Sequence, residues 1–213
     1  MTLSLNGLCI DPLDHPYNAT ADNERCVEVP LALEFLRSRP GPVLEVGNVL
    51  SHYADVAQLP ERVVVDLNER AVDERGAPVL NVDVCSWTPP ALFDRIIAVS
   101  TIEHVGWDVP APHPFTAEAA IHRLRSWLAP GGRALVTVPL GYHPPLDAAL
   151  GRLEALSAVL VRHGRLSWRS APAERWEFAT VPARAEFVRR FPYDRSIPTA
   201  TGLWVGEFSR PST

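Results

Sequence analysis

The residues best suited to chemistry form a polar cluster, Ser100 to His104, which directly follows an apolar run. Imidazole changes protonation near neutral pH, so His104 on a loop after a strand is well placed to act as a general base. The neighbouring Glu103 could orient the ring or raise its basicity. The alternative is a histidine that only hydrogen-bonds the backbone and shapes the loop.

A second candidate site combines Gly47, after the first apolar run, with Asp66, about twenty residues later. A carboxylate at that spacing can hold the two vicinal hydroxyls of a nucleotide ribose. Gly47 leaves room for a ligand, and Asn48 adopts the left-handed backbone region more readily than most residues. The full glycine-rich dinucleotide motif is absent, because residues 48–51 contain no glycine. An ordinary strand-to-helix turn with a solvated aspartate is the alternative.

Further polar and aromatic residues follow the later apolar runs. Asp83 could accept a hydrogen bond from an adenine amino group or merely cap a turn. Trp87 could cover an adenine, but we favour a place in the core. Tyr142 and His143 could line the same crevice as His104. The remaining histidines are dispersed without the spacing of metal ligands, so we expect no metal site.

The order of predicted elements explains how these residues could meet. Valine-rich runs predict buried strands, and apolar residues spaced by three or four predict helices. The predicted strands are 43–47, 62–67, 78–84, 93–100, 133–139, 166–170 and 201–208. The predicted helices are 22–37, 51–59, 116–128 with Thr116 as N-cap, and one marked by Leu146, Leu150, Leu153 and Leu160 that ends at Gly164.

This alternation predicts an α/β fold, a doubly wound, Rossmann-like and mostly parallel sheet with helices on both faces. Ligands of such sheets bind beyond the carboxyl ends of the strands, near the point where the strand order reverses. The candidate residues follow the predicted strands at those ends. We therefore expect them to lie around one crevice.

Composition narrows the function further. The chain has 213 residues, a mass of 23.5 kDa and a net charge of −5. All 20 basic residues are arginines, which excludes lysine Schiff bases and the P-loop lysine. The negative charge argues against nucleic-acid partners. No apolar run is long enough for a membrane helix, and the first residues carry no positive charge, so we expect a cytoplasmic protein without a membrane partner.

The motifs EVGN, VVVDLNE, NVDV, FDRIIAVSTIEHVG and LRSWLAPGGRALVTVP occur in this order in residues 43–140. Together they resemble the class I S-adenosylmethionine-dependent methyltransferases. More narrowly, EVGNVLSHY, STIEHVGWD and VPLGYHPPLD are similar to a bacterial methyltransferase-like group often found with polysaccharide or secondary-metabolite genes. NERCVEVP and TGLWVGEF also have counterparts there, so the resemblance spans the whole chain.

The resemblance implies one domain over residues 1–213, with an N-terminal lid and helix (1–40), a cofactor-binding half (41–140) and an acceptor-side half (141–213). It implies S-adenosylmethionine as cofactor, S-adenosylhomocysteine as product, and no metal. The implied cofactor contacts are Glu45, Gly47 and Asn48 at the methionine part, Asp66 and Leu67 at the ribose, Asp83 and Val84 at the adenine, and Ser100 and Thr101 beneath the sulfonium.

On the acceptor side the resemblance implies His104, Trp107, Tyr142 and His143 as contacts. It places Tyr17 and Asn18 on the lid, and we count Tyr17 among the acceptor contacts. From their position after the strand, we expect His104 and Glu103 to be the catalytic residues. We expect a small-molecule acceptor and slightly favour an oxygen atom, because His104 would then have a proton to remove. Nitrogen and carboxylate acceptors stay open, and the sequence fixes no oligomeric state. The rival functions are a nicotinamide-dependent oxidoreductase, disfavoured by the missing glycine motif, and a non-catalytic protein with the same fold.

Overall fold

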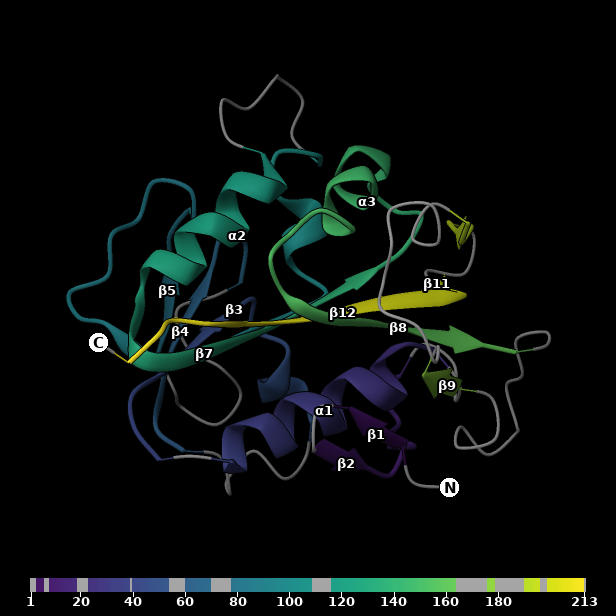
Figure 1. Ribbon diagram of the computed structural model, residues 1–213, viewed down its shortest axis with the longest axis horizontal. Coiled ribbons are helices and arrows are strands. Elements are labelled where there is room, and N and C mark those ends of the chain that lie inside the picture. The colour runs from purple at the N-terminus through teal and green to yellow at the C-terminus, as the bar shows by residue number, and fades with distance from the viewer. Residues whose placement is uncertain are drawn as a thin grey trace.

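The chain is built around an eight-stranded sheet with the strand order β5-β4-β3-β6-β7-β12-β8-β9 (Figure 1). The computed structural model describes residues 3–5, 8–18, 23–38, 40–53, 60–69, 78–108, 116–163, 176–178, 190–195 and 199–212. The strands of the sheet are β3 (Val43–Val46), β4 (Arg62–Asp66), β5 (Val79–Asn81), β6 (Phe93–Val99), β7 (Leu128–Pro139), β8 (Leu156–Arg162), β9 (Trp176–Phe178) and β12 (Gly202–Ser209).

The sheet has a parallel half and an antiparallel half. Strands β5, β4, β3, β6 and β7 are parallel neighbours, whereas β12 pairs antiparallel with both β7 and β8, and β9 pairs antiparallel with β8. Two short hairpins lie outside it: β1 (Leu3–Leu5) with β2 (Leu8–Ile10), and β10 (Tyr193–Asp194) with β11 (Thr199–Ala200). The predicted doubly wound, mostly parallel sheet is confirmed.

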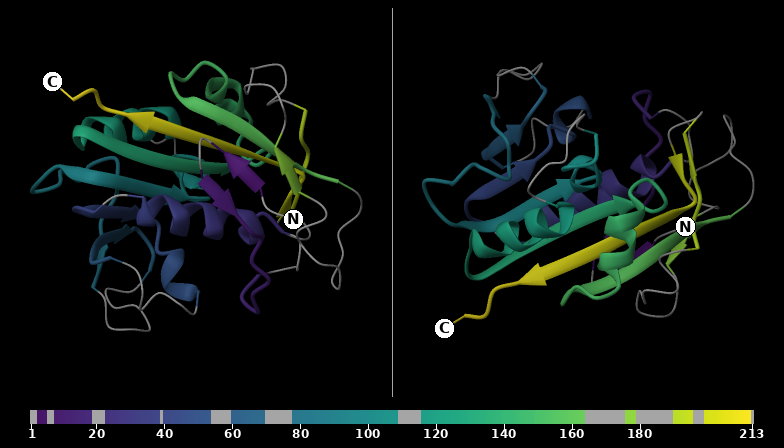
Figure 2. Two further views of the ribbon diagram at one scale, coloured as in Figure 1. Left: turned by 60° about the horizontal axis from the view of Figure 1, so that its bottom comes forward. Right: turned by 90° about the horizontal axis from the view of Figure 1, so that it is seen from above.

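Helices cover both faces of the sheet, as predicted (Figures 1 and 2). Helix α1 (Arg25–Arg37) packs on one face, and α2 (Ala117–Ser126) and α3 (Pro144–Leu150) pack on the other. Side chains alternate between the two cores along each strand: Ile96 belongs to the core beneath α2, and the next residue, Ile97, belongs to the core beneath α1. This double burial explains why the central strands read as continuous apolar runs.

Pro30 lies inside α1 and cannot donate the hydrogen bond that the helix needs at that position. The carbonyl left open is that of Cys26, and it accepts a hydrogen bond of 2.7 Å from the Leu13 N–H. The proline therefore does not interrupt the helix. Instead it frees the Cys26 carbonyl, which anchors the segment before α1 by a hydrogen bond from Leu13.

Two sequence predictions differ from the structure in this part of the chain. The predicted helix through Leu160 ends at Leu150, and residues 156–162 form β8. Leu153 and Leu160 fitted a helical spacing, but β8 has a long antiparallel partner in β12 that supplies its backbone hydrogen bonds. The predicted helix 116–128 is shorter, and Leu128 already belongs to β7. Its predicted N-cap is confirmed, since the Thr116 side chain accepts a hydrogen bond from the Ala119 N–H.

The remaining predicted elements agree in part with the structure. Strand β5 covers only Val79–Asn81 of the predicted 78–84. The predicted helix 51–59 begins with the 3-10 turn η1 (Leu50–His52), and residues 54–59 lie outside the described residues. The predicted strand 166–170 also lies outside them, whereas the strand predicted at 201–208 is confirmed as β12.

Candidate active site

A cavity of about 450 Å³ opens at the carboxyl ends of β3, β4 and β6. The chain order reverses here, because β4 and β5 extend the sheet on one side of β3 and β6 extends it on the other. Most of the predicted site residues line this cavity: Tyr17, Gly47, Asn48, Asp66, Leu67, Asp83, Val84, Ser100, Thr101 and His104. Glu45, Glu103, Trp107, Tyr142 and His143 do not line it.

The turn after β3 depends on Gly47. Its φ of 84° lies in the left-handed region, and a Cβ at this position would lie 2.0 Å from Thr101 Oγ1. Glu45, predicted at the methionine part of the cofactor, has its carboxylate turned to other partners: it accepts hydrogen bonds from Arg62 Nε at 2.5 Å and from the Leu50 N–H at 2.7 Å. Glu45 therefore stabilises the turn after β3 through Leu50 and does not line the cavity itself.

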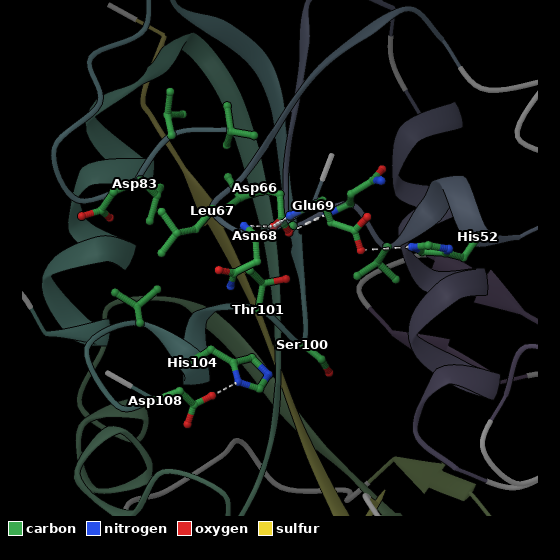
Figure 3. Close-up of a pocket in the computed structure, with 18 of the residues that line it drawn as sticks. His52, Asp66, Leu67, Asn68, Glu69, Asp83, Ser100, Thr101, His104 and Asp108 are labelled. Atoms are coloured by element: carbon green, nitrogen blue, oxygen red, sulfur yellow. Dashed lines mark hydrogen bonds and ion pairs between the residues drawn. The ribbon is translucent and has the colours of Figure 1, made fainter. Parts of the chain in front are cut away.

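Asp66 joins two loops of the cavity wall (Figure 3). Its Oδ2 accepts from the Asn48 N–H at 3.2 Å, and its Oδ1 accepts from the N–H groups of Asn68 at 2.8 Å and Glu69 at 2.9 Å. A carboxylate has about four lone-pair sites, so these bonds leave capacity for a ligand hydroxyl. The side chain that could hold a ribose therefore also sets the shape of the wall.

The residues that follow β5 form a turn at Asp83 and then pack against the core through Trp87. Asp83 Oδ1 accepts from the Cys85 N–H at 2.8 Å, so this side chain caps the turn. Trp87 packs edge-to-face on Trp127, with ring centroids 5.5 Å apart, so it lies partly buried against the core, close to the predicted place.

A lid contact lies on the side of the cavity away from Asp83. The ring of Tyr17 stacks on His52 with centroids 4.6 Å apart and planes 2° apart. His52 Nε2 lies 3.4 Å from Glu69 Oε1, and both residues line the cavity (Figure 3). Asn18 Oδ1 accepts a hydrogen bond of 2.9 Å from the Tyr53 hydroxyl. The segment before α1 therefore reaches the cavity edge, as the predicted lid requires, although His52 and Glu69 were not predicted.

Ser100 ends β6 in a backbone conformation that is rare for a non-glycine residue, with φ of 39°. The buried carboxylate of Glu28 on α1 holds it there: Glu28 Oε1 accepts from the hydroxyls of Ser100 at 2.5 Å and Thr137 at 2.6 Å. Arg25 NH1 donates to Glu28 Oε2 at 3.2 Å and to the Val99 carbonyl at 3.3 Å. Sequence reasoning missed this clamp, whose only signal is a charged residue inside an apolar helix pattern.

His104 takes part in a three-residue contact. Its Nδ1 contacts the Asp108 carboxylate, which also accepts a hydrogen bond from the Tyr142 hydroxyl at 2.8 Å. The second ring nitrogen, Nε2, lies on the side of Ser100 (Figure 3), 3.7 Å from Glu103 Oε1. Hydrogen bonding by His104 and Tyr142 lowers the pKa of Asp108 against the opposing effect of burial. The ionised Asp108 thereby holds Nδ1 and leaves Nε2 open to a reaction partner.

The predicted acceptor-side residues form an aromatic group next to this contact. Trp107 stacks on His143 with centroids 4.5 Å apart, and Tyr142 packs edge-to-face on His104 at 4.9 Å and on Tyr193 at 5.0 Å. Burial lowers the pKa of His143 and so favours its neutral imidazole form. Asp108 and Tyr193 were not predicted, although Asp108 follows His104 at a spacing of four.

No family model matches the chain, and no curated protein does. Solved structures with a similar fold include the N-methyltransferase NodS from Bradyrhizobium japonicum (16% identity, 83% of this chain and 90% of that chain, TM-score 0.46). A second is the 1,6-didemethyltoxoflavin-N1-methyltransferase from Burkholderia thailandensis (16% identity, 99% of both chains, TM-score 0.48). A third is the glycopeptide N-methyltransferase MtfA (14% identity, 82% of this chain and 83% of that chain, TM-score 0.39). Within the described parts of the chain, no helix is long and apolar enough to cross a membrane.

Proposed function

We propose that this protein transfers a methyl group from S-adenosylmethionine to a small-molecule acceptor. The observation that carries this proposal is the cavity at the strand-order reversal, where Gly47, Asp66, Ser100 and His104 all meet. Its volume of about 450 Å³ lies in the range of small-ligand sites. The residues present fit the cofactor, because Asp66 keeps acceptor capacity for a ribose hydroxyl and the Gly47 turn has no side chain in the way.

In this proposal the cofactor end of the cavity uses the groups after β3, β4 and β5. The backbone of Gly47 and Asn48 faces the methionine part, Asp66 and Leu67 face the ribose, and Val84 with Asp83 faces the adenine. Ser100 and Thr101 pass beneath the sulfonium. When bound, S-adenosylmethionine supplies the activated methyl group.

The protein's own contribution is alignment and proton removal. Trp107, Tyr142 and His143 form the aromatic group next to His104 and support the acceptor end from outside the cavity lining, and Tyr17 covers the open side. His104 Nε2 removes the acceptor's proton, while Asp108 holds Nδ1 and so fixes the tautomer and the orientation of the ring. Holding the reacting atoms in line supplies the larger share of the acceleration, because effective molarities reach about 10⁵–10⁸ M in well-oriented reactions.

Calorimetric titration with S-adenosylmethionine, S-adenosylhomocysteine and NADH tests the proposal. We expect both sulfur ligands to bind in the range of about 1 µM to 1 mM, as for ordinary enzyme substrates, and NADH to give no binding heat. Binding of NADH alone would favour an oxidoreductase. Binding of none of the three would favour a non-catalytic protein.

A further inference from the structure

The carboxylate of Glu28 is fully buried on α1, and both of its oxygens have partners. Oε1 accepts from the hydroxyls of Ser100 and Thr137, and Oε2 accepts from Arg25 NH1. Every one of these partners is a donor, which fits a carboxylate, because a carboxylate only accepts. A buried ion pair is often no more stabilising than apolar residues of similar volume, so we looked for its contribution in the conformation that it fixes.

Ser100 is held from two sides by this one carboxylate. Its hydroxyl donates to Glu28 directly. Its N–H donates to Thr137, both to the carbonyl and to Oγ1, each at 3.2 Å. The single hydroxyl proton of Thr137 is donated to Glu28, so a lone pair of Oγ1 is available for the Ser100 N–H. The Ser100 backbone therefore depends on Glu28 both directly and through Thr137.

The second oxygen of Glu28 helps to fix the residue before Ser100. Arg25 NH1 donates both to Glu28 Oε2 and to the Val99 carbonyl, at 3.3 Å from the latter. The same carbonyl accepts from the Thr101 hydroxyl at 2.9 Å. These contacts surround Ser100 and maintain its φ of 39°, which a residue with a side chain rarely adopts.

The direction of the chain at Ser100 decides where the next residues lie. Thr101 follows so close to the turn after β3 that a Cβ on Gly47 would lie 2.0 Å from Thr101 Oγ1. The Thr101 carbonyl accepts from the His104 N–H at 3.2 Å and so begins the 3-10 turn η3 (Ile102–His104). Ser100, Thr101 and His104 all line the cavity (Figure 3). One backbone conformation therefore sets both the surface between β3 and β6 and the turn that carries His104.

We propose that Glu28 is a positioning residue for methyl transfer. This inference rests on the proposed function. Glu28 holds Ser100 at positive φ, and thereby places the surface of Ser100 and Thr101 beneath the sulfonium and the His104 ring beside the acceptor. Glu28 does not line the cavity, so it acts through Ser100. Glycine adopts positive φ without help, so Glu28 should matter much less when residue 100 is glycine.

The experiment compares Glu28→Gln in two backgrounds, the wild type and Ser100→Gly. The affinity for S-adenosylhomocysteine is measured by calorimetry. In the wild-type background we expect Glu28→Gln to weaken binding by about ten-fold or more, because a neutral amide cannot hold Arg25 and both hydroxyls together. In the Ser100→Gly background we expect the same substitution to weaken binding by less than about three-fold, because the two sites are coupled.

A second measurement needs no ligand. The ring of His104 is observed by NMR in protein with isotope-labelled histidine, and its signals are assigned by their absence in His104→Gln. We expect these signals to shift between wild type and Glu28→Gln, but not between Ser100→Gly and the double variant. The signals of His163, which pairs with Glu177 outside the site, should not move in any of these comparisons.

A matched control is Glu34→Gln, the same substitution at a partly exposed carboxylate of α1. It should change neither the affinity nor the His104 signals. A contribution to stability alone predicts a lower melting temperature for Glu28→Gln with unchanged affinity and unmoved His104 signals, and this result would overturn the inference. Equal losses of affinity in the two backgrounds would also overturn it, because Ser100 would then not connect Glu28 to the cavity.

Thr137→Val replaces Glu28→Gln if the latter does not fold, because it removes one hydroxyl partner of Glu28 and keeps a side chain of similar size. It should weaken binding and shift the His104 signals in the wild-type background only, and the absence of both effects would overturn the inference. Failure of the wild-type protein to bind S-adenosylmethionine or S-adenosylhomocysteine would instead remove the proposed function. The His104 signals would then still show whether Glu28 places that ring.

Discussion

The two ends of the cavity are built in different ways. At the end near Asp66 and Asp83, the carboxylates bind backbone N–H groups of their own or neighbouring turns. At the end near His104, the carboxylates of Asp108 and Glu28 bind side chains that come from distant parts of the chain, such as Tyr142 and Thr137. One end therefore follows from local strand-end geometry, and the other exists only after the whole domain has packed.

This difference assigns a separate measurable property to each end. A change at the Asp66 end should alter cofactor affinity, because this end shapes a binding surface. A change at the His104 end should alter turnover, because His104 is the proposed general base. Charges at the His104 end are also buried by tertiary packing, so this end should make stability depend on pH.

The largest effect is expected for His104→Gln. Loss of a general base lowers turnover by about 10²–10⁴, while S-adenosylmethionine binding should stay nearly unchanged. Turnover is measured from the release of S-adenosylhomocysteine with the methyl acceptor, and affinity for S-adenosylmethionine is measured by calorimetry. The conservative variant Asp108→Asn should lose less turnover, because it keeps Nε2 as the base.

Full activity in His104→Gln would end the general-base assignment. Loss of S-adenosylmethionine binding in that variant would instead assign His104 to cofactor binding. Either result would contradict the assignment of cofactor affinity to the Asp66 end and of turnover to the His104 end.

A pH effect is expected from Glu24, at the His104 end. Burial raises the pKa of Glu24 from its usual 4.5 to about 7, with Glu28 adding to the effect. The unfolded chain releases this proton near pH 4.5, so between pH 4.5 and 7 the unfolded state binds fewer protons than the folded state. The free energy of unfolding should therefore fall as pH rises through this window, by up to about 3 kcal/mol.

Urea unfolding at pH 5 and pH 7.5 measures this effect in wild type and in Glu24→Gln, whose amide oxygen can still accept from Thr199 and Ala200. The variant should lose part of the decrease between the two pH values. Glu34→Gln, which removes a partly exposed carboxylate of the same helix that lies 3.8 Å from Arg37, should not. Identical decreases in wild type and Glu24→Gln would show that Glu24 does not titrate in this window.

A smaller effect is expected for Asp66→Ala at the cofactor end. Each hydrogen bond between an ionised carboxylate and a ribose hydroxyl contributes about 1.5–3 kcal/mol. Affinity for S-adenosylmethionine should fall by roughly ten- to a hundred-fold, since about 1.4 kcal/mol corresponds to ten-fold. Because Asp66 also binds three backbone N–H groups, circular dichroism must show that the variant is folded. Unchanged affinity in the folded variant would remove Asp66 from the site.

The smallest effect is expected with nucleic acid. The chain has a net charge of −5, so duplex DNA and RNA should not bind at physiological salt. Fluorescence anisotropy at micromolar protein measures this. A salt-sensitive increase in anisotropy would reopen nucleic acids as acceptors.

The sequence located the residues at the Asp66 end of the cavity better than the partners of His104, for a physical reason. Strand ends can be located from apolar runs, and Gly47, Asp66 and Thr101 follow such runs directly. The partners of His104 and Ser100 come from distant segments, and no local pattern marks them. The carboxylate neighbour expected for His104 was Glu103, whereas Asp108 is the one that contacts Nδ1.

The same limit explains the element that was wrong. Leu146 and Leu150 belong to a helix, and Leu153 and Leu160 continue its spacing, so the local pattern favours a longer helix. The strand β8 forms because β12 lies beside it, and β12 is more than forty residues away in the sequence. Long-range pairing thus outweighs the local preference.

The position of β12 has a consequence for synthesis of the protein. β12 lies between β7 and β8 and pairs with both, although it follows them in the chain. When β8 leaves the ribosome, the strand that connects it to the rest of the sheet has not yet been made. The nascent chain must therefore carry β8 with an unpaired edge until residues 202–209 emerge, and unpaired strand edges are prone to aggregation.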